Sequence, residues 1–385
     1  MRTVVVGGGL GGLAAALALH HAGHEVAVLE RRPEVSEVGA GIGLPPNGVL
    51  ALDALGLGGQ IRALADPLRT GAGLRDRLGR PLLVSDQQAL ERAAGAPFVV
   101  APRSWLHGVL ASALPAGTVR TGVTVDGPDD EALAGADLVV AADGARSRLR
   151  AALFPQHPGL VGSGEHAVRA IAPVDRHALD VVPGEFVDHR SGERFGCLPM
   201  AEGGVYWYST WRTARSGTPP DEPAAWQRWL LARRADWHPS VTALISATPP
   251  ETVHVTETAQ LHPPLPTFVS GRVALLGDAA HAMTPDLGQG ACQAFEDAAV
   301  LGAALTGATA DDVPAALARY AALRCPRTAE MQRQARRINR LLGMTGPAAR
   351  LRDAVFRRVP PAVAAKALIA QFRFEPAGTS DSLAR

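Results

Sequence analysis

Apolar runs alternate with glycine-rich and helix-forming stretches at the start of the chain, in the order expected for a βαβ unit. A short β-branched run covers Thr3–Val6, and a second apolar run covers Glu25–Glu30. Between them lie a glycine turn, Gly7–Gly12, and an Ala- and Leu-rich stretch, Leu13–His21, with the composition of a helix. This order predicts two parallel strands joined through one helix.

Similar patterns continue to about residue 155. They predict, in chain order, a helix from Pro46 to the glycines at 56–59, a hairpin over Gly71–Asp86, a helix over Arg103–Leu114 and a buried strand over Asp137–Ala142. Residues 121–130 are polar and short of apolar positions, so they predict a loop.

The chain changes character between about residues 156 and 265, where aromatic residues, prolines and short alternating runs are frequent. Arg194–Leu198 and Val205–Trp211 read as strands of an antiparallel sheet with one covered face, followed by helices over Glu222–Arg234 and Val241–Ser246. A strand is then expected at Val273–Leu276, where the sequence pattern again resembles that of the first 155 residues. Long helices are expected over 288–305 and 314–343, with a break at Pro360-Pro361.

The glycine turn Gly7–Gly12 fits the G-x-G-x-x-G pattern of dinucleotide-binding folds. Gly7 allows the tight turn, Gly9 lets a pyrophosphate approach the backbone, and Gly12 lets the helix pack against the strand. Glu30 ends the second strand at about the offset of the acid that binds a ribose diol. A carboxylate there disfavours a 2′-phosphate, so the site predicts FAD or NAD rather than NADP.

A second match to the glycine pattern covers residues 162–167. It lacks an obvious preceding strand and following helix, so it predicts a loop. We therefore expect a single dinucleotide fold.

Composition narrows the class of protein further. The chain has 385 residues, of which 47% are hydrophobic and 19% are charged, which is typical of a globular protein. Its 38 basic and 37 acidic residues leave a net charge of +1, which argues against a nucleic-acid partner. Three cysteines without a C-x-x-C pair and twelve histidines without ligand spacing argue against a metal site. With no leader pattern and no apolar run of membrane length, a cytoplasmic protein without a membrane partner is expected.

Two further motifs follow predicted strands. Asp143–Arg150 fits D-G-x-x-S-x-x-R, and Gly277–His281 reads G-D-A-A-H, followed by Pro285–Gly290, P-D-L-G-Q-G. With the glycine turn, Gly39-Ala40-Gly41-Ile42 and Arg103-x-x-Leu106, these residues resemble the FAD-dependent aromatic hydroxylases. These are single-component class A flavoprotein monooxygenases with the p-hydroxybenzoate hydroxylase fold, and the salicylate-, 3-hydroxybenzoate- and urate-hydroxylase-like branch is the most similar.

The resemblance implies an α/β fold in which a Rossmann-like FAD-binding domain is interleaved with an antiparallel-sheet substrate domain and followed by C-terminal helices. The limits expected are 1–75, 96–155 and 266–345 for the FAD-binding domain, 76–95 and 156–265 for the substrate domain, and 346–385 for the C-terminal helices and tail. A monomer or homodimer is expected.

The resemblance also assigns cofactor-binding residues. It implies that Glu30 holds the adenosine ribose, Arg103 contacts the diphosphate, and Asp278 binds the ribityl and diphosphate side. It also implies a structural role for Asp143, near the path of the nicotinamide cofactor. The other residues expected at the FAD are Gly7, Gly9, Leu10, Gly12, Arg31, Gly41, Ile42, Pro285, Gly288, Gln289, Gly290 and Ala291.

Three residues are candidates for the chemistry with substrate. The resemblance places Pro285 at the isoalloxazine ring, and it implies that Arg194 and Tyr206 lie on substrate-facing strands. An arginine there can bind an anionic or phenolate-like substrate, and a tyrosine can exchange its proton. The alternative is that Tyr206 packs in the sheet and Arg194 forms an ion pair; the sequence leaves both open.

The implied activity is that of an FAD-dependent monooxygenase. NADH or NADPH reduces the flavin transiently, O₂ adds to form a C4a-hydroperoxide, and one oxygen atom passes to an aromatic or similarly electron-rich small molecule. Alternatives are an epoxidase of alkenes with the same cofactor chemistry and, with less support, a non-catalytic flavin-binding protein.

Overall fold

Strand β1 (Arg2–Val6) lies inside a six-stranded sheet and pairs in parallel with β2 (Glu25–Glu30) and β8 (Leu138–Ala141). The computed structural model of the chain describes residues 1–34, 40–65, 73–84, 86–175 and 181–375. The strand order is β14-β15-β8-β1-β2-β7, where β7 is Val119–Thr121, β14 is Val269–Ser270 and β15 is Val273–Leu275. All pairs are parallel except β14 with β15. Strand β15 therefore returns, late in the chain, to the sheet that the first residues began.

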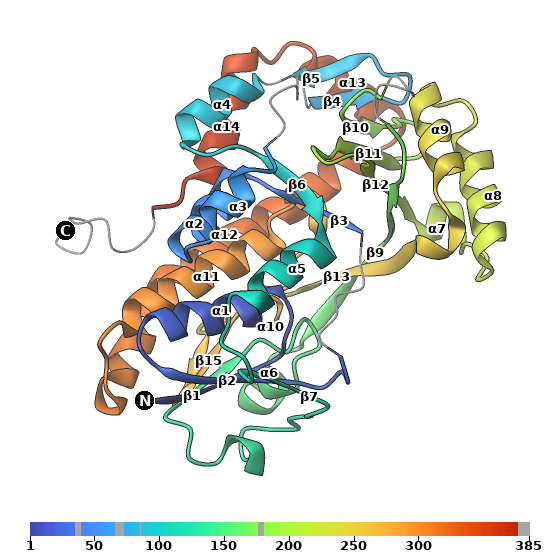
Figure 1. Cartoon of the computed structure of the whole chain (residues 1–385). Helices are drawn as coiled ribbons and strands as arrows, with labels where there is room; N and C mark the ends of the chain where they lie inside the picture. Colours follow the sequence, from blue (N-terminus) through green and yellow to red (C-terminus); the bar gives the residue numbers. More distant parts are fainter. Residues whose placement is uncertain (35–39, 66–72, 85, 176–180, 376–385) are drawn as a thin grey trace.

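Helix α1 (Leu10–His21) explains why the first apolar stretch has no polar face. Residues 12–19 are all buried, because α1 packs between the sheet and helix α11 (Gly290–Leu305), as Figure 1 shows. A helix covered on both sides is apolar all round. It begins at Leu10 rather than at the expected Leu13, which brings its first turn up to the glycine loop.

The second layer is a seven-stranded sheet with the order β13-β9-β12-β11-β10-β4-β5. Its strands are β4 (Gly73–Asp76), β5 (Pro81–Val84), β9 (Leu160–Ala172), β10 (Gly184–Val187), β11 (Arg194–Pro199), β12 (Val205–Arg212) and β13 (His254–Leu261). The expectation of a loop at residues 162–167 was wrong, because these residues lie inside β9. Eight residues of this strand, 165–172, pair with β12 in an unbroken antiparallel register. Long strand pairing overrides the local glycine signal.

One face of this sheet is buried under helices α8 (Pro223–Arg234) and α9 (Pro239–Ala247). The layer between them contains Phe195, Trp207, Trp211, Trp226 and Leu230, among others. The opposite face carries Tyr206 and Tyr208 and lies toward a small sheet of β3 (Gly41–Leu44) and β6 (Val99–Pro102). The alternating strands thus place one set of aromatic residues in a core and the other set at the domain boundary.

The remaining elements complete the shell. They are the helices α2 (Pro46–Ala54), α3 (Gly58–Arg62), α4 (Gln87–Ala94), α5 (Arg103–Ser112), α6 (Arg148–Leu153), α7 (Thr213–Ser216), α10 (Asp278–His281), α12 (Val313–Leu342), α13 (Gly346–Phe356) and α14 (Pro361–Phe372), and the 3-10 turns at Glu131–Leu133, Pro250–Thr252, Pro285–Leu287 and Ala310–Asp312. In Figure 1 the long helix α12 runs beside α11, and α13 and α14 lie near β4 and β5.

The expected hairpin is confirmed in its described part by β4 and β5, which join the seven-stranded sheet. Strand β4 starts at Gly73, earlier than the expected domain limit after residue 75. The division of the chain into domains otherwise stays a prediction. Gly39, Gly71 and residues 376–385 lie outside the described residues.

Gly12 holds the glycine turn against α1. A Cβ at this position would overlap the carbonyl oxygen of Gly7. Alanine usually stabilises a helix relative to glycine, but here it forces the turn and the helix apart.

We expect Gly12→Ala to lower the free energy of unfolding by about 3 kcal/mol, measured by urea denaturation. The matched control is Gly59→Ala in α3, where a Cβ has no heavy atom within 4 Å; it should leave stability unchanged or raise it by up to about 1 kcal/mol. Equal stability of the two variants would contradict the close packing of the turn.

Candidate active site

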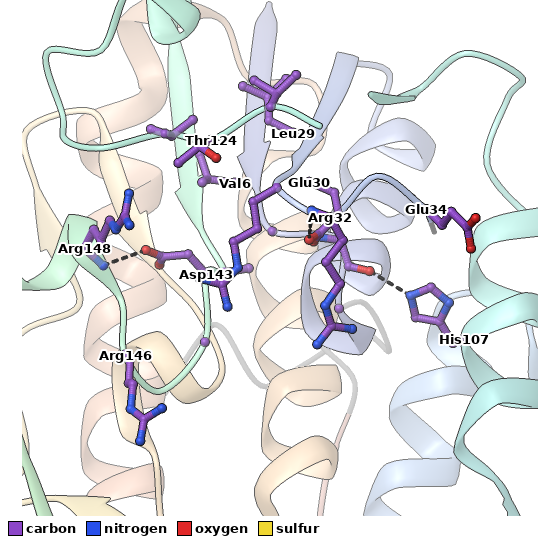
Figure 2. Close-up of a pocket in the computed structure, with 18 residues that line it drawn as sticks. Val6, Leu29, Glu30, Arg32, Glu34, His107, Thr124, Asp143, Arg146 and Arg148 are labelled. Carbon is purple, nitrogen blue, oxygen red and sulfur yellow. Dashed lines mark hydrogen bonds between the residues drawn. The ribbon is translucent and has the colours of Figure 1, made fainter. Parts of the chain in front are cut away.

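A cavity of about 230 Å³ opens at the carboxyl ends of β1, β2 and β8. Its walls are formed by the glycine turn, by the residues after β2 and by the D-G motif after β8. Figure 2 shows Glu30, Arg32, His107, Asp143, Arg146 and Arg148 among the residues that line it. Asp143 accepts a hydrogen bond from the backbone amide of Arg148, and His107 Nε2 forms one with the carbonyl oxygen of Gly8. Ligands of open α/β sheets bind at this edge.

Glu30 is fixed in this cavity by two backbone groups. Its Oε2 accepts a hydrogen bond from the Gly8 amide at 2.6 Å, and its Oε1 accepts one from the Arg32 amide at 2.9 Å. A carboxylate accepts about four hydrogen bonds, so Glu30 retains capacity for a pair of hydroxyl groups. Gly9, the N-cap of α1, supplies no side-chain cap, which leaves the helix N-terminus to an anionic ligand.

The D-G motif ties the cavity to the rest of the fold. Asp143 Oδ2 accepts hydrogen bonds from the amides of Arg148 and Leu149, the first two residues of α6, whose N-cap is Ser147. Its Oδ1 is buried without a hydrogen-bond partner. Arg150, the last residue of the motif, donates to the carbonyl oxygens of Ala279 at 3.0 Å and Ala145 at 2.7 Å. Arg150 therefore links the D-G motif to the G-D motif.

The G-D motif meets the start of α11. A Cβ built at Gly290 would lie 3.9 Å from Asp278 Oδ1, so the Asp278 carboxylate faces the first turn of α11. Asp278 is exposed, whereas its neighbours in α10 are buried. Helix α11 begins at Gly290, two residues later than expected, after the short turn Pro285–Leu287.

Asp297 on α11 holds the G-D motif in place through buried hydrogen bonds. Its Oδ2 accepts hydrogen bonds from the Gly277 amide at 3.0 Å and from His281 Nε2 at 2.6 Å, and its Oδ1 accepts one from Arg324 at 2.6 Å. Burial alone raises the pKa of Asp297, but His281 and Arg324 outweigh it and hold the pKa at about 2. The charged carboxylate thus joins α10, α11 and α12.

A second part of the network positions the turn before α11. Asn47 on α2 and Gln289 bond to each other through both amide groups, at 2.8 and 3.1 Å. Glu296 accepts from Asn47 and from Gln293 and pairs with Arg324 and Arg327. Gln289 is buried and fixed from α2 and α11.

Arg194 lies at the boundary between the seven-stranded sheet and this turn. It pairs with Glu165 at 3.0 Å, Glu185 at 3.3 Å and Asp286 at 2.8 Å, and its Nε donates to Thr210. Asp286 belongs to the turn Pro285–Leu287, so the ion pair with Asp286 connects the sheet to the turn. Asn339 on α12 also donates to Glu165 and Asp286.

Tyr206 lies against β3. A Cβ at Gly41 would overlap the ring of Tyr206, so the glycine lets this ring pack on the strand. Burial raises the pKa of Tyr206, which keeps its hydroxyl protonated at neutral pH. Around it lie Ala40, Val100, Met200 and the partly buried Phe98, Ile171, Leu198 and Tyr208. This group, called the aromatic layer below, lies between the seven-stranded sheet and the small sheet of β3 and β6.

Comparison with known proteins decides the family. A model of the FAD binding domain matches residues 1–113 and 109–335. The aurachin C monooxygenase/isomerase of Stigmatella aurantiaca is 35% identical over 359 residues, which cover 89% of each chain. The FAD-dependent urate hydroxylase of Klebsiella pneumoniae is 33% identical over 354 residues, which cover 88% of this chain and 89% of the relative.

The chain belongs to the FAD-dependent aromatic hydroxylases. A crystal structure of Klebsiella pneumoniae HpxO with FAD and uric acid has the same fold, with a TM-score of 0.86, 28% identity and coverage of 97% of this chain and 96% of that one. The fold expected from the resemblance is confirmed, and FAD is the cofactor.

The residues expected at FAD lie mainly in two places, the cavity and the turn before α11. Of the expected cofactor residues, Gly7, Gly9, Glu30, Arg31 and Asp143 line the cavity. Pro285, Gly288, Gln289, Gly290 and Ala291 lie together at the start of α11. The roles of these residues, of Leu10 and Gly12 in α1, of Gly41 and Ile42 in β3, and of Arg103 and Asp278 stay predictions.

Sequence reasoning missed the charged residues that support the hydroxylase site. Glu296, Asp297 and Arg324 are buried, and none of the sequence motifs contains them. A signal was present, because adjacent acids within the apolar α11 stretch require buried partners.

The described part of the hydroxylase has neither a candidate membrane span nor a candidate metal cluster. No helix there is long and apolar enough to cross a membrane. No cluster of three or more potential metal ligands occurs among those same residues.

We expect Asp297→Asn to lower the free energy of unfolding by about 3 kcal/mol, because Arg324 loses a buried charge partner. Since the pKa of Asp297 is lowered from 3.8 to about 2, its contribution is complete above pH 4 and is lost as the pH falls toward 2. The difference between wild type and variant, measured by urea denaturation, should therefore narrow below pH 4.

The control is Glu330→Gln, which removes the exposed ion pair with Arg333 and should change stability by less than about 1 kcal/mol. A loss as large as that of Asp297→Asn would show that burial is not what makes Asp297 important.

Proposed function

We propose that this flavoprotein uses NADH or NADPH and O₂ to hydroxylate an aromatic or similarly electron-rich small molecule at the aromatic layer. The observation that carries the proposal is the ion pair between Arg194 and Asp286. It joins the sheet face that carries Tyr206 and Tyr208 to the turn at which FAD residues are expected. A substrate in contact with the aromatic layer would then lie beside the reactive end of the cofactor.

The residues at the cavity would hold the adenosine and diphosphate part of FAD. The glycine turn and the uncapped N-terminus of α1 suit the diphosphate, and Glu30 has free acceptor capacity for the ribose hydroxyls. Arg103 and Asp278 would complete the diphosphate side.

The start of α11 would face the flavin ring. Gly288 and Gly290 carry no side chain, and Ala291 only a methyl group, so backbone amides can come close. The helix dipole stabilises negative charge at this end, which favours the reduced form of the ring. Bound FAD supplies electron transfer from the nicotinamide and activation of O₂.

The protein's own part in the reaction is to orient the ring of the substrate and exclude water. Apolar and aromatic side chains of the layer suit both tasks. Tyr206, protonated at neutral pH, would donate a hydrogen bond to a phenolic or carbonyl oxygen of the substrate. Arg194 would keep Asp286, and with it the turn, in place. The proposal also places the enzyme in the cytoplasm, as a monomer or homodimer.

Removal of the Glu30 carboxylate tests the cofactor site. We expect Glu30→Ala to weaken FAD binding by about 10- to 100-fold, as lost hydrogen bonds to a charged group would. Glu34→Ala is the control, since Glu34 lines the same cavity but is exposed; its affinity should stay within about threefold of wild type. Titration of the apoprotein with FAD, followed by flavin fluorescence, measures both; equal affinities would refute the placement of the ribose.

Turnover tests the reaction. We expect NAD(P)H oxidation by the FAD-loaded enzyme to rise with a hydroxylated aromatic ligand and to consume O₂ with formation of a hydroxylated product. Tyr206→Phe should lower kcat about tenfold or more with unchanged FAD affinity. Tyr320→Phe removes a buried hydroxyl that bonds to Leu275 outside the layer, and should lower stability but not kcat. A Tyr206→Phe variant with full turnover would return Tyr206 to a packing role.

A further inference from the structure

Three carboxylates share one guanidinium at the edge of the aromatic layer. Glu165, Glu185 and Asp286 all pair with Arg194. The Arg194 nitrogens are each engaged, because Nη2 reaches two of the carboxylates, Nη1 the third, and Nε the hydroxyl of Thr210. Four of the five N–H groups of Arg194 are thus engaged, so Arg194 cannot bind a ligand carboxylate through a pair of hydrogen bonds. The cluster also holds three carboxylates against one guanidinium.

Glu185 differs from the other two carboxylates in its exposure. Its side chain is 20% exposed, whereas those of Glu165 and Asp286 are 2% and 0% exposed. Its bond to Arg194 is also the longest of the three. A carboxylate accepts about four hydrogen bonds, so Glu185 can accept a further donor from outside the cluster.

Tyr208 brings Glu185 into the aromatic layer. In the sheet, Glu185 pairs with Gly196 on β11, and Gly196 pairs with Tyr208 on β12, so the two side chains lie on one face. A Cβ at Gly196 would overlap the Tyr208 ring. The ring thus lies across the glycine, with its hydroxyl close enough to the Glu185 carboxylate to affect the pKa of Glu185. Tyr208 is partly exposed and belongs to the aromatic layer.

We infer that Glu185, which lies beside Tyr208 on this face of the sheet, selects the substrate: it accepts a hydrogen bond from an N–H, NH₂ or O–H group on a ring without negative charge, and it excludes ring carboxylates. This inference rests on the proposed function, since it takes the aromatic layer as the substrate site.

The electrostatics of the cluster support this selection. Burial raises the pKa of Glu185; among its charged neighbours, Arg194 lowers the pKa, whereas Asp286 and Glu165 raise it further. Because the neighbouring carboxylates already disfavour negative charge at Glu185, they also repel the negative charge of an anionic ligand bound there. A neutral donor meets no such repulsion and gains a charge-assisted hydrogen bond.

Matched ligands test the inference on the FAD-loaded enzyme. The probes are 2-, 3- and 4-hydroxybenzamide and the corresponding hydroxybenzoates, which differ mainly in charge and in the N–H donor. Dissociation constants come from the change in flavin absorbance on binding. We expect at least one amide to bind about tenfold or more tightly than its acid, and Glu185→Gln to reduce that ratio to about threefold or less.

Two further variants keep the result interpretable. Glu257→Gln, an exposed glutamate on β13, should leave the ratio unchanged. Tyr208→Phe should weaken amide binding several-fold with little effect on the acids, because it removes only the hydroxyl beside the Glu185 carboxylate.

Tighter binding of the acids, binding of neither series, or an unchanged ratio in Glu185→Gln would overturn the inference. Failure of the proposed function would look different, since the wild-type protein would then not retain FAD or would not oxidise NAD(P)H in the presence of any ligand. A wild type that keeps its flavin and turns over, but prefers carboxylates, would leave the proposed function intact.

Discussion

The buried charge of Asp297 is the constraint on which the rest of the site depends. A carboxylate without access to water is costly unless its oxygens are well paired. Here the pairing comes from the Gly277 amide, from His281 and from Arg324, which belong to three different segments. The cost of burying this charge is offset only when α10, α11 and α12 are in their native places. The position of the G-D motif is therefore coupled to the packing of the long C-terminal helices.

Two other arginines, Arg150 and Arg194, form buried contacts that join the remaining parts of the site. Arg150 connects the D-G motif to α10, and Arg194 connects the seven-stranded sheet to the turn before α11. The cavity at the glycine turn and the aromatic layer are thus held relative to each other by buried polar contacts. The proposed placement of FAD requires such a frame, since it puts the two ends of the cofactor in segments that are far apart in the sequence.

Much of the fold could be predicted from the sequence because the governing signals are local. The β-branched run of β1, the glycine turn and the acid at Glu30 lie within thirty residues, and their geometry follows from their order. The loop expected at residues 162–167 failed because β9 is fixed by pairing with strands more than thirty residues away. Arg194 and Tyr206 were identified as candidates, but only the fold shows that Asp286, Glu165 and Glu185 surround Arg194. Side-chain partners from distant segments leave no spacing that a sequence can reveal.

The central claim is that the glycine turn and the start of α11 close around one FAD. Hydrogen–deuterium exchange of the apoprotein, with and without FAD, tests it most directly. We predict that FAD slows exchange at the amides of residues 7–12 and 287–292 together, although nearly three hundred residues separate them in the sequence. Protection of only one of these two segments would contradict the account.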